Sequence, residues 1–146
     1  MSVRQATILL VEDDDVDAET VERGLKAARI EATLVRARDG VEAFDLLEGR
    51  NGRQKIKPPL LLLVDIRMPR MDGLSFIRAV RRNISLQRTI VFVLTTSDSE
   101  RDQLAAYNEH VAGYIVKTGA ADQYDRLALM LEYYLSIVEL PPTAVA

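Results

Sequence analysis

A run of five apolar residues, 60–64, constrains the fold of this chain more than any other feature. Pro58 and Pro59 precede the run and Pro69 follows it, which leaves no room for a helix. A short, continuous apolar run then indicates a strand buried on both faces, as in a parallel sheet. The run ends at Asp65, a carboxylate whose burial is costly unless another group offsets it. Because open α/β sheets place ligands at the carboxyl ends of strands, we expect Asp65 in a binding site.

The rest of the chain alternates apolar strands with amphipathic helices. The predicted strands span residues 6–11, 32–37, 60–64, 89–94 and 113–116. The predicted helices span residues 16–29, 41–48, 74–82, a segment from a Ser97–Glu100 capping box to about His110, and residues 122–138. This alternation predicts an α/β fold with a doubly wound, five-stranded parallel sheet and helices on both faces. The expected strand order is the flavodoxin-like 2-1-3-4-5.

Length and composition fit one domain. The chain has 146 residues, of which 48% are hydrophobic and 28% are charged. We expect a single domain over residues 1–146, with a core of about 7–138 and a C-terminal tail of 139–146. No apolar run reaches membrane-spanning length and none precedes the first strand, which predicts a cytoplasmic protein without membrane contact. A net charge of −3 without a basic stripe argues against direct nucleic-acid binding.

Polar residues follow most of the predicted strands. Glu12 and Asp13 follow the first strand, Asp65 the central one, Thr95 the next, and Lys117 the last. Because parallel strands end at one edge, we expect these groups to share a pocket. Three carboxylates there would raise each other's pKa, a conflict that a divalent cation resolves. Oxygen ligands without His or Cys favour Mg²⁺ or Mn²⁺.

Such a site suits phosphoryl chemistry, since a metal ion, a lysine and a hydroxyl together neutralise phosphoryl oxygens. The chain lacks the G-x-x-x-x-G-K loop that cradles a nucleotide, so the phosphoryl group must arrive on another donor. An aspartate carboxylate is an established nucleophile for that group. By contrast, Asp14, Asp15 and Asp17 are expected to be acids at a helix N-terminus, which the helix dipole favours.

Four segments at the strand ends, ILLVEDD, LLVDIRMPRMDG, VFVLTTS and GYIVK, together resemble the receiver domain of bacterial two-component response regulators. The resemblance covers residues 7–138. It implies that Asp65 accepts a phosphoryl group from a phosphohistidine on a sensor histidine kinase. It also implies that Glu12, Asp13 and Asp65 bind Mg²⁺, with the backbone carbonyl of Arg67 as a further ligand.

The resemblance assigns roles to the later strand ends as well. Thr95, with Thr96 beside it, would contact the phosphoryl group, and Lys117 would pair with it. Tyr114 would be the switch aromatic that turns inward, although a strand tyrosine is often a core residue with a solvated tip. Thr118 stands where most receivers have proline, so the sequence leaves open whether the peptide after Lys117 is cis or trans.

A second likeness concerns the later part of the chain. The segments TTSDSERDQLAAYNEHVAGYIVKTG and VELPP are similar to the small single-domain regulators of bacterial and cyanobacterial phytochromes. This likeness implies a bacteriophytochrome as the sensor kinase and red or far-red light as the signal.

The leading hypothesis is a phosphoacceptor switch that is not chiefly an enzyme and that signals through protein contacts, without a DNA-binding output domain. An Mg²⁺-dependent phosphatase with an Asp nucleophile is the alternative, but such enzymes need a second Asp where Arg67 stands. A flavodoxin-like cofactor binder would need a phosphate-cradling loop at residues 12–15, where four acids would repel a phosphate.

The last predicted helix is apolar over more of its surface than one sheet contact requires. The residues expected to face the sheet are Leu127, Leu131, Tyr134, Leu135 and Val138. Leu129, Tyr133 and Ile137 fall on another side. Because exposed apolar patches mark interaction sites, we expect a homodimer through this helix. The alternative is that residues 140–146 fold back over the patch.

Overall fold

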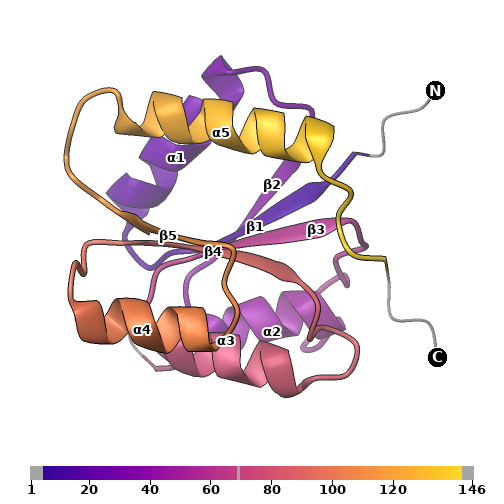
Figure 1. The fold of residues 1–146 in the computed structure, drawn as a ribbon. Coiled ribbons are helices and arrows are strands. Elements are labelled where there is room, and N and C mark those ends of the chain that lie inside the picture. The colour runs from indigo at the N-terminus through magenta and orange to yellow at the C-terminus, as the bar shows by residue number, and fades with distance from the viewer. Residues whose placement is uncertain (1–4, 69, 143–146) are drawn as a thin grey trace.

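Five parallel strands form one sheet in the order β2-β1-β3-β4-β5, as predicted. This computed structural model describes residues 5–68 and 70–142. The strands are β1 Thr7–Val11, β2 Thr33–Ala37, β3 Leu60–Val64, β4 Ile90–Thr95 and β5 Gly113–Val116. The helices are α1 Asp15–Ala27, α2 Gly40–Glu48, α3 Gly73–Arg82, α4 Glu100–Asn108 and α5 Gln123–Ile137. Figure 1 shows α1 and α5 on one face of the sheet and α2, α3 and α4 on the other.

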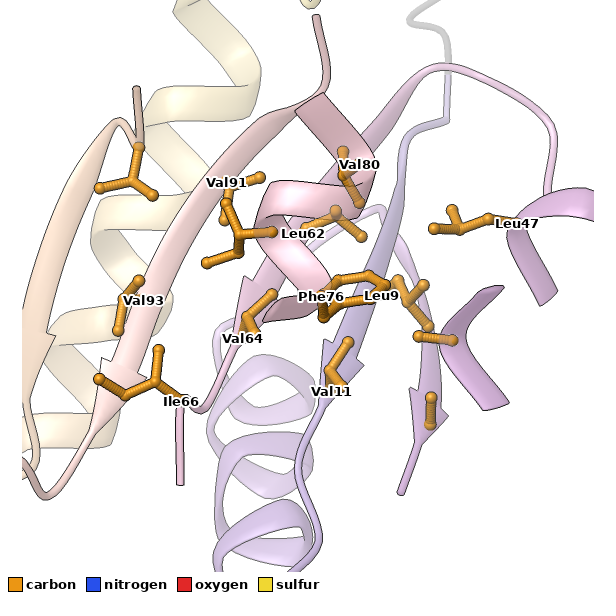
Figure 2. Close-up of a cluster of buried hydrophobic side chains, with 14 of the residues drawn as sticks. Leu9, Val11, Leu47, Leu62, Val64, Ile66, Phe76, Val80, Val91 and Val93 are labelled. Carbon is orange, nitrogen blue, oxygen red and sulfur yellow. The ribbon is translucent and has the colours of Figure 1, made fainter. Parts of the chain in front are cut away.

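The β3 strand is buried on both faces of the sheet, which explains its unbroken apolar sequence. Leu62 and Val64 belong to the core cluster beside α2 and α3, whereas Leu61 and Leu63 belong to the cluster beside α1 and α5. All four side chains are fully buried. Figure 2 shows Phe76 of α3 at the centre of the first cluster, among side chains of β1, β3 and β4. Both helical layers therefore hold the central strand in place.

The start of α4 differs from the prediction. The predicted capping box at Ser97–Glu100 is wrong, because α4 begins at Glu100 and its N-cap is Ser99. The Ser99 hydroxyl accepts the backbone N–H of Asp102 at 3.1 Å. Ser97 is engaged elsewhere, since its hydroxyl donates to the Asp102 carboxylate. The helix therefore starts after the segment that Ser97 ties to Asp102.

The end of α5 also differs from the prediction. Val138 was expected to face the sheet, yet it is 37% exposed. The helix ends at Ile137, and Val138 has extended backbone angles, φ −91° and ψ 128°. A residue beyond the helix end no longer follows the 3.6-residue period from which the expectation came.

The C-terminal tail leaves α5 and runs toward the opposite helical layer (Figure 1). Pro141 and Pro142 line a cavity together with Leu47 of α2 and Ile56 of the α2–β3 loop. The part of the tail that the structure describes therefore lies away from the α5 patch. The rest of the predicted tail, residues 143–146, and the predicted loop residue Pro69 lie outside the described residues.

Arg81, in the last turn of α3, joins three segments that are distant in sequence. Its guanidinium donates to the backbone carbonyls of Gln87 and Thr89 at 2.8 Å each. It also donates to the carbonyls of Glu109 at 2.7 Å and His110 at 3.1 Å. One planar group thus connects α3 with the loops that enter β4 and β5, and the partly buried carbonyls of Thr89 and Glu109 would be costly to leave without a donor.

We predict that Arg81→Lys lowers the free energy of unfolding by about 2 kcal/mol, because an ammonium cannot reproduce the fork of donors and leaves carbonyls unpaired. The matched control is Arg82→Lys at the exposed neighbouring position, which should change stability by less than ~0.5 kcal/mol. Urea unfolding measures both variants. Equal stability of the two variants would contradict the role of Arg81.

Candidate functional site

Three carboxylates gather at the carboxyl edge of the sheet. Glu12, Asp13 and Asp65 each offer an oxygen, and these oxygens lie within 4.8 Å of one another. The cause is strand pairing: Val11 lies opposite Val64 in the β1–β3 ladder, so the residues that follow both strands emerge side by side. Glu12 and Asp65 are buried, whereas Asp13 is exposed. An all-oxygen donor set of this kind fits a hard divalent cation.

Lys117 neutralises part of this charge. Its Nζ lies 2.5 Å from Glu12 Oε1, 3.2 Å from Asp65 Oδ2 and 2.8 Å from Asp17 Oδ2. Burial acts to lower the pKa of Lys117, but the hydrogen bonds to Asp17 and Glu12 outweigh it and the pKa is raised. Lys117 therefore stays an ammonium. Asp17, expected as a plain helix N-terminal acid, is part of the site because the first turn of α1 places it beside Lys117.

The Asp65 carboxylate is held from two sides. Its Oδ1 accepts the backbone N–H of Arg67 at 2.9 Å, and its Oδ2 faces Lys117. Behind it, a Cβ at Gly73 would lie 2.3 Å from the Asp65 carbonyl oxygen and 2.5 Å from the Cα of Ile66. Only glycine allows α3 to begin so close to this loop. Nothing in the sequence indicated this close packing.

Arg36 is a residue of the site that the sequence analysis missed. It lies on β2, and its Nε and Nη2 donate to the Glu12 carbonyl at 3.0 and 2.9 Å. Its Nη1 also contacts Asp15 Oδ1 at 2.7 Å. This arginine fixes the backbone that carries Glu12 and Asp13. No local sequence motif predicts such a contact, because its acceptor is a backbone carbonyl.

Thr95 and Tyr114 both meet the β4–α4 loop at Ser97. Thr95 is fully buried, and its Oγ1 accepts the Ser97 N–H at 3.4 Å. The Tyr114 hydroxyl donates to the Ser97 carbonyl at 2.8 Å, and burial raises the pKa of Tyr114. Thr96 is exposed, and among the described residues its side chain makes no hydrogen bond. Thr95 and Tyr114 are thus linked through one loop, while Thr96 stands apart.

The Arg67 side chain reaches away from Asp65 toward α4. Its Nη2 lies 2.8 Å from Asp102 Oδ2 and 3.5 Å from Ser97 Oγ. This contact connects the loop after β3 with the first turn of α4, a link that no pattern in the sequence indicated.

Within residues 5–68 and 70–142 the one cis peptide joins Pro58 to Pro59, so the peptide after Lys117 is trans.

The fold and the acidic strand ends define a flavodoxin-like receiver. The chain belongs to the response regulator receiver domain family, whose model matches residues 8–128. Response regulator Rcp1 from Synechocystis sp. is 34% identical over 135 residues, which cover 92% of this chain and 92% of Rcp1. The predicted family is therefore confirmed, and the match favours a response regulator over the phosphatase alternative.

Two solved structures extend the comparison. The Mn(2+)-bound form of response regulator Rcp1 has a TM-score of 0.83 and 33% identity, over 93% of this chain and 99% of that chain. The phosphorylated cyanobacterial phytochrome response regulator RcpA has a TM-score of 0.86 and 30% identity, over 95% of this chain and 100% of that chain. The predicted likeness to phytochrome regulators is thus confirmed. Across the described residues, no helix has the length and apolar character needed to span a membrane.

The pKa of Glu12 is raised from its ordinary value of 4.5 to about 7 by burial, with a further contribution from Asp65 against the opposing effect of Lys117. Native protein therefore holds a proton that the unfolded chain has released. The stabilisation is complete below the unfolded pKa of 4.5 and is lost as pH rises through the folded pKa of about 7.

We predict that metal-free protein loses stability relative to Glu12→Gln as pH rises from about 5 to 8, by up to about 3 kcal/mol. Glutamine imitates the protonated side chain and has no proton to release. Chemical unfolding in a chelator, at several pH values, measures the difference. Glu19→Gln, an exposed position on α1, is the control and should follow wild type. Parallel pH curves for wild type and Glu12→Gln would contradict the raised pKa.

Proposed function

We propose that this protein is the phosphoacceptor of a two-component system and that Asp65 receives the phosphoryl group from a sensor histidine kinase. The observation that carries the proposal is the position of the Asp65 carboxylate, beside Lys117 and within 4.8 Å of oxygens of Glu12 and Asp13. A buried nucleophile flanked by an ammonium and a set of oxygen donors suits phosphoryl transfer.

Glu12, Asp13 and Asp65 would hold Mg²⁺ or Mn²⁺, with the backbone carbonyl of Arg67 as a further ligand. When bound, the ion neutralises charge on the phosphoryl oxygens. An Asp65 oxygen attacks phosphorus and forms an acyl phosphate, while the phosphorus–nitrogen bond of the phosphohistidine breaks and its electron pair stays on the imidazole. Lys117 pairs with the phosphoryl group and stabilises the product.

The β4 and β5 residues would respond to the new phosphoryl group. Thr95 would donate its hydroxyl proton to a phosphoryl oxygen, while its Oγ1 accepts the Ser97 N–H at 3.4 Å. Thr96 would lie at the entrance to the pocket. Tyr114 would turn inward and release its hydrogen bond to the Ser97 carbonyl. The shared contact at Ser97 supports coupling between the two events.

Similarity to the phytochrome response regulator RcpA supports a bacteriophytochrome as the kinase and red or far-red light as the signal. In this proposal residues 1–146 form one cytoplasmic receiver domain, of which the family match covers residues 8–128. The protein signals through protein contacts and does not contact nucleic acid directly. It assists its own phosphorylation and hydrolysis but is not a turnover enzyme.

We further propose a homodimer through α5. Leu129, Tyr133 and Ile137 are 48%, 63% and 75% exposed on this helix, which supports the predicted patch. The described residues of the tail do not cover it, because Pro141 and Pro142 line a cavity on the α2 side. A two-fold contact between identical helices would bury these side chains.

We predict that Asp65→Asn abolishes acyl-phosphate formation without unfolding the protein, because asparagine keeps the shape but removes the nucleophile. Acetyl phosphate with Mg²⁺ is the donor, and intact mass is the measurement. Asp72→Asn, at the exposed N-cap of α3, is the control and should accept one phosphoryl group like wild type. A full-yield adduct on Asp65→Asn would exclude Asp65, and steady phosphate release by wild type would favour the phosphatase.

We predict that Leu129→Glu with Tyr133→Glu gives a folded monomer by light scattering, because two carboxylates cannot be buried in an apolar contact. Leu104→Glu with Tyr107→Glu is the matched control on α4, where the two side chains are 65% and 50% exposed. The control should remain dimeric. A wild type that is monomeric at high micromolar concentration, or a dimeric α5 variant, would show that α5 is not the interface.

A further inference from the structure

Two segments of the chain are rich in cations and contain no acid. Residues 49–60 include four cations, and residues 73–97 include four more, in a chain whose net charge is −3. The eight residues are Arg50, Arg53, Lys55, Lys57, Arg78, Arg81, Arg82 and Arg88. The sequence showed no basic stripe because the two segments are separated by β3 and the loop that carries Asp65.

The fold brings the two segments together at the amino edge of the sheet, opposite Asp65. A cavity of about 270 Å³ lies between them, with Lys55 from the first segment and Arg88 from the second in its lining. The apolar part of the lining includes Leu47, Ile56, Leu60, Leu86, Pro141 and Pro142. An open groove of about 530 Å³ along α2 and α3 shares Glu48 and Asn83 with the cavity, so the two hollows adjoin.

The cations on this surface differ in how well they are neutralised. Arg50 pairs with Glu48 at 3.0 Å, and Arg78 lies 3.6 Å from Glu109. Four other cations are exposed, and none of them forms an ion pair within the part of the chain that the structure describes; they are Lys55, Lys57, Arg82 and Arg88. Ile84, between the two arginines, is 78% exposed. The surface thus offers uncompensated positive charge around an apolar hollow.

We propose that this basic face, formed by Lys55, Lys57, Arg82, Arg88 and the cavity between them, docks an acidic segment of a partner protein. One apolar side chain of the segment enters the cavity, and its carboxylates lie beside the four cations. Opposite potentials bring the partner to the surface, and the apolar side chain anchors it. The proposal extends the signalling role by giving it an output surface, and it does not depend on phosphorylation of Asp65.

The shape of the surface favours a peptide segment over other anions. The cavity is smaller than the ~300–1,000 Å³ of sites that enclose a small molecule. A single-stranded nucleic acid is commonly bound by stacking on aromatic faces, but Phe44, which borders the groove, packs edge-on against Phe76 with ring centroids 5.2 Å apart. A bilayer surface cannot enter a concave hollow, whereas an extended segment can fill both cavity and groove.

A random-peptide phage library, selected on unphosphorylated wild-type protein, tests the proposal. We expect enriched peptides to carry Asp or Glu on both sides of a large apolar residue. Arg82→Glu with Arg88→Glu should weaken binding of the enriched peptide at least tenfold by fluorescence anisotropy. Arg23→Glu with Lys26→Glu, the same charge change at exposed positions of α1, should alter it less than twofold.

Lys55→Glu with Lys57→Glu provides a second test on a loop, and it decides the matter if the arginine variant does not fold. This lysine variant should also lose tenfold or more. Enrichment of peptides without acids, no enrichment, or equal losses in the basic-face and α1 variants would overturn the proposal. So would tighter binding of a single-stranded DNA oligonucleotide or of phosphatidylserine-containing vesicles than of the enriched peptide. Because the protein is unphosphorylated, a failure of phosphotransfer leaves the result unchanged.

Discussion

The contact between the Lys117 ammonium and three carboxylates is the interaction on which the functional edge depends. Glu12, Asp17 and Asp65 come from two strand ends and the first turn of α1, and Lys117 ends a third strand. Without the cation, Glu12 and Asp65 would repel each other, and burial, which already raises the pKa of Glu12 to about 7, would favour its neutral form further. With Lys117 present, the carboxylate cluster keeps enough negative charge to attract a divalent ion. The parallel sheet makes this balance possible because it ends all these strands at one edge.

The backbone around Asp65 is fixed by contacts that leave its carboxylate free to react. Gly73 allows α3 to start against the Asp65 carbonyl, and the Arg67 N–H holds one carboxylate oxygen. Arg36 fixes the neighbouring segment through the Glu12 carbonyl. Positioning of this kind lowers the reorganisation needed for a reaction, since the groups already lie where charge develops.

The sequence was sufficient to predict the sheet order and the gathering of Glu12, Asp13, Asp65 and Lys117, because burial on both faces and parallel strand ends both follow from apolar patterning. It did not indicate Arg36 or Arg81, whose guanidinium groups bind backbone carbonyls. Every residue carries such a carbonyl, so no pattern of side chains marks the acceptor. The start of α4 was misplaced because Ser97 fits the spacing of a capping box, whereas Ser99, two residues later, is the residue that caps the helix.

Strand direction places opposite ends of the helices at the two edges of the sheet. Helix N-termini lie at the carboxyl edge, where the dipoles of α1 and α4 favour the acids Asp14 and Glu100. The last turn of α3 lies at the amino edge, where the helix dipole favours the cation Arg82. An acidic cluster at one edge and a basic face at the other are consistent with this parallel topology.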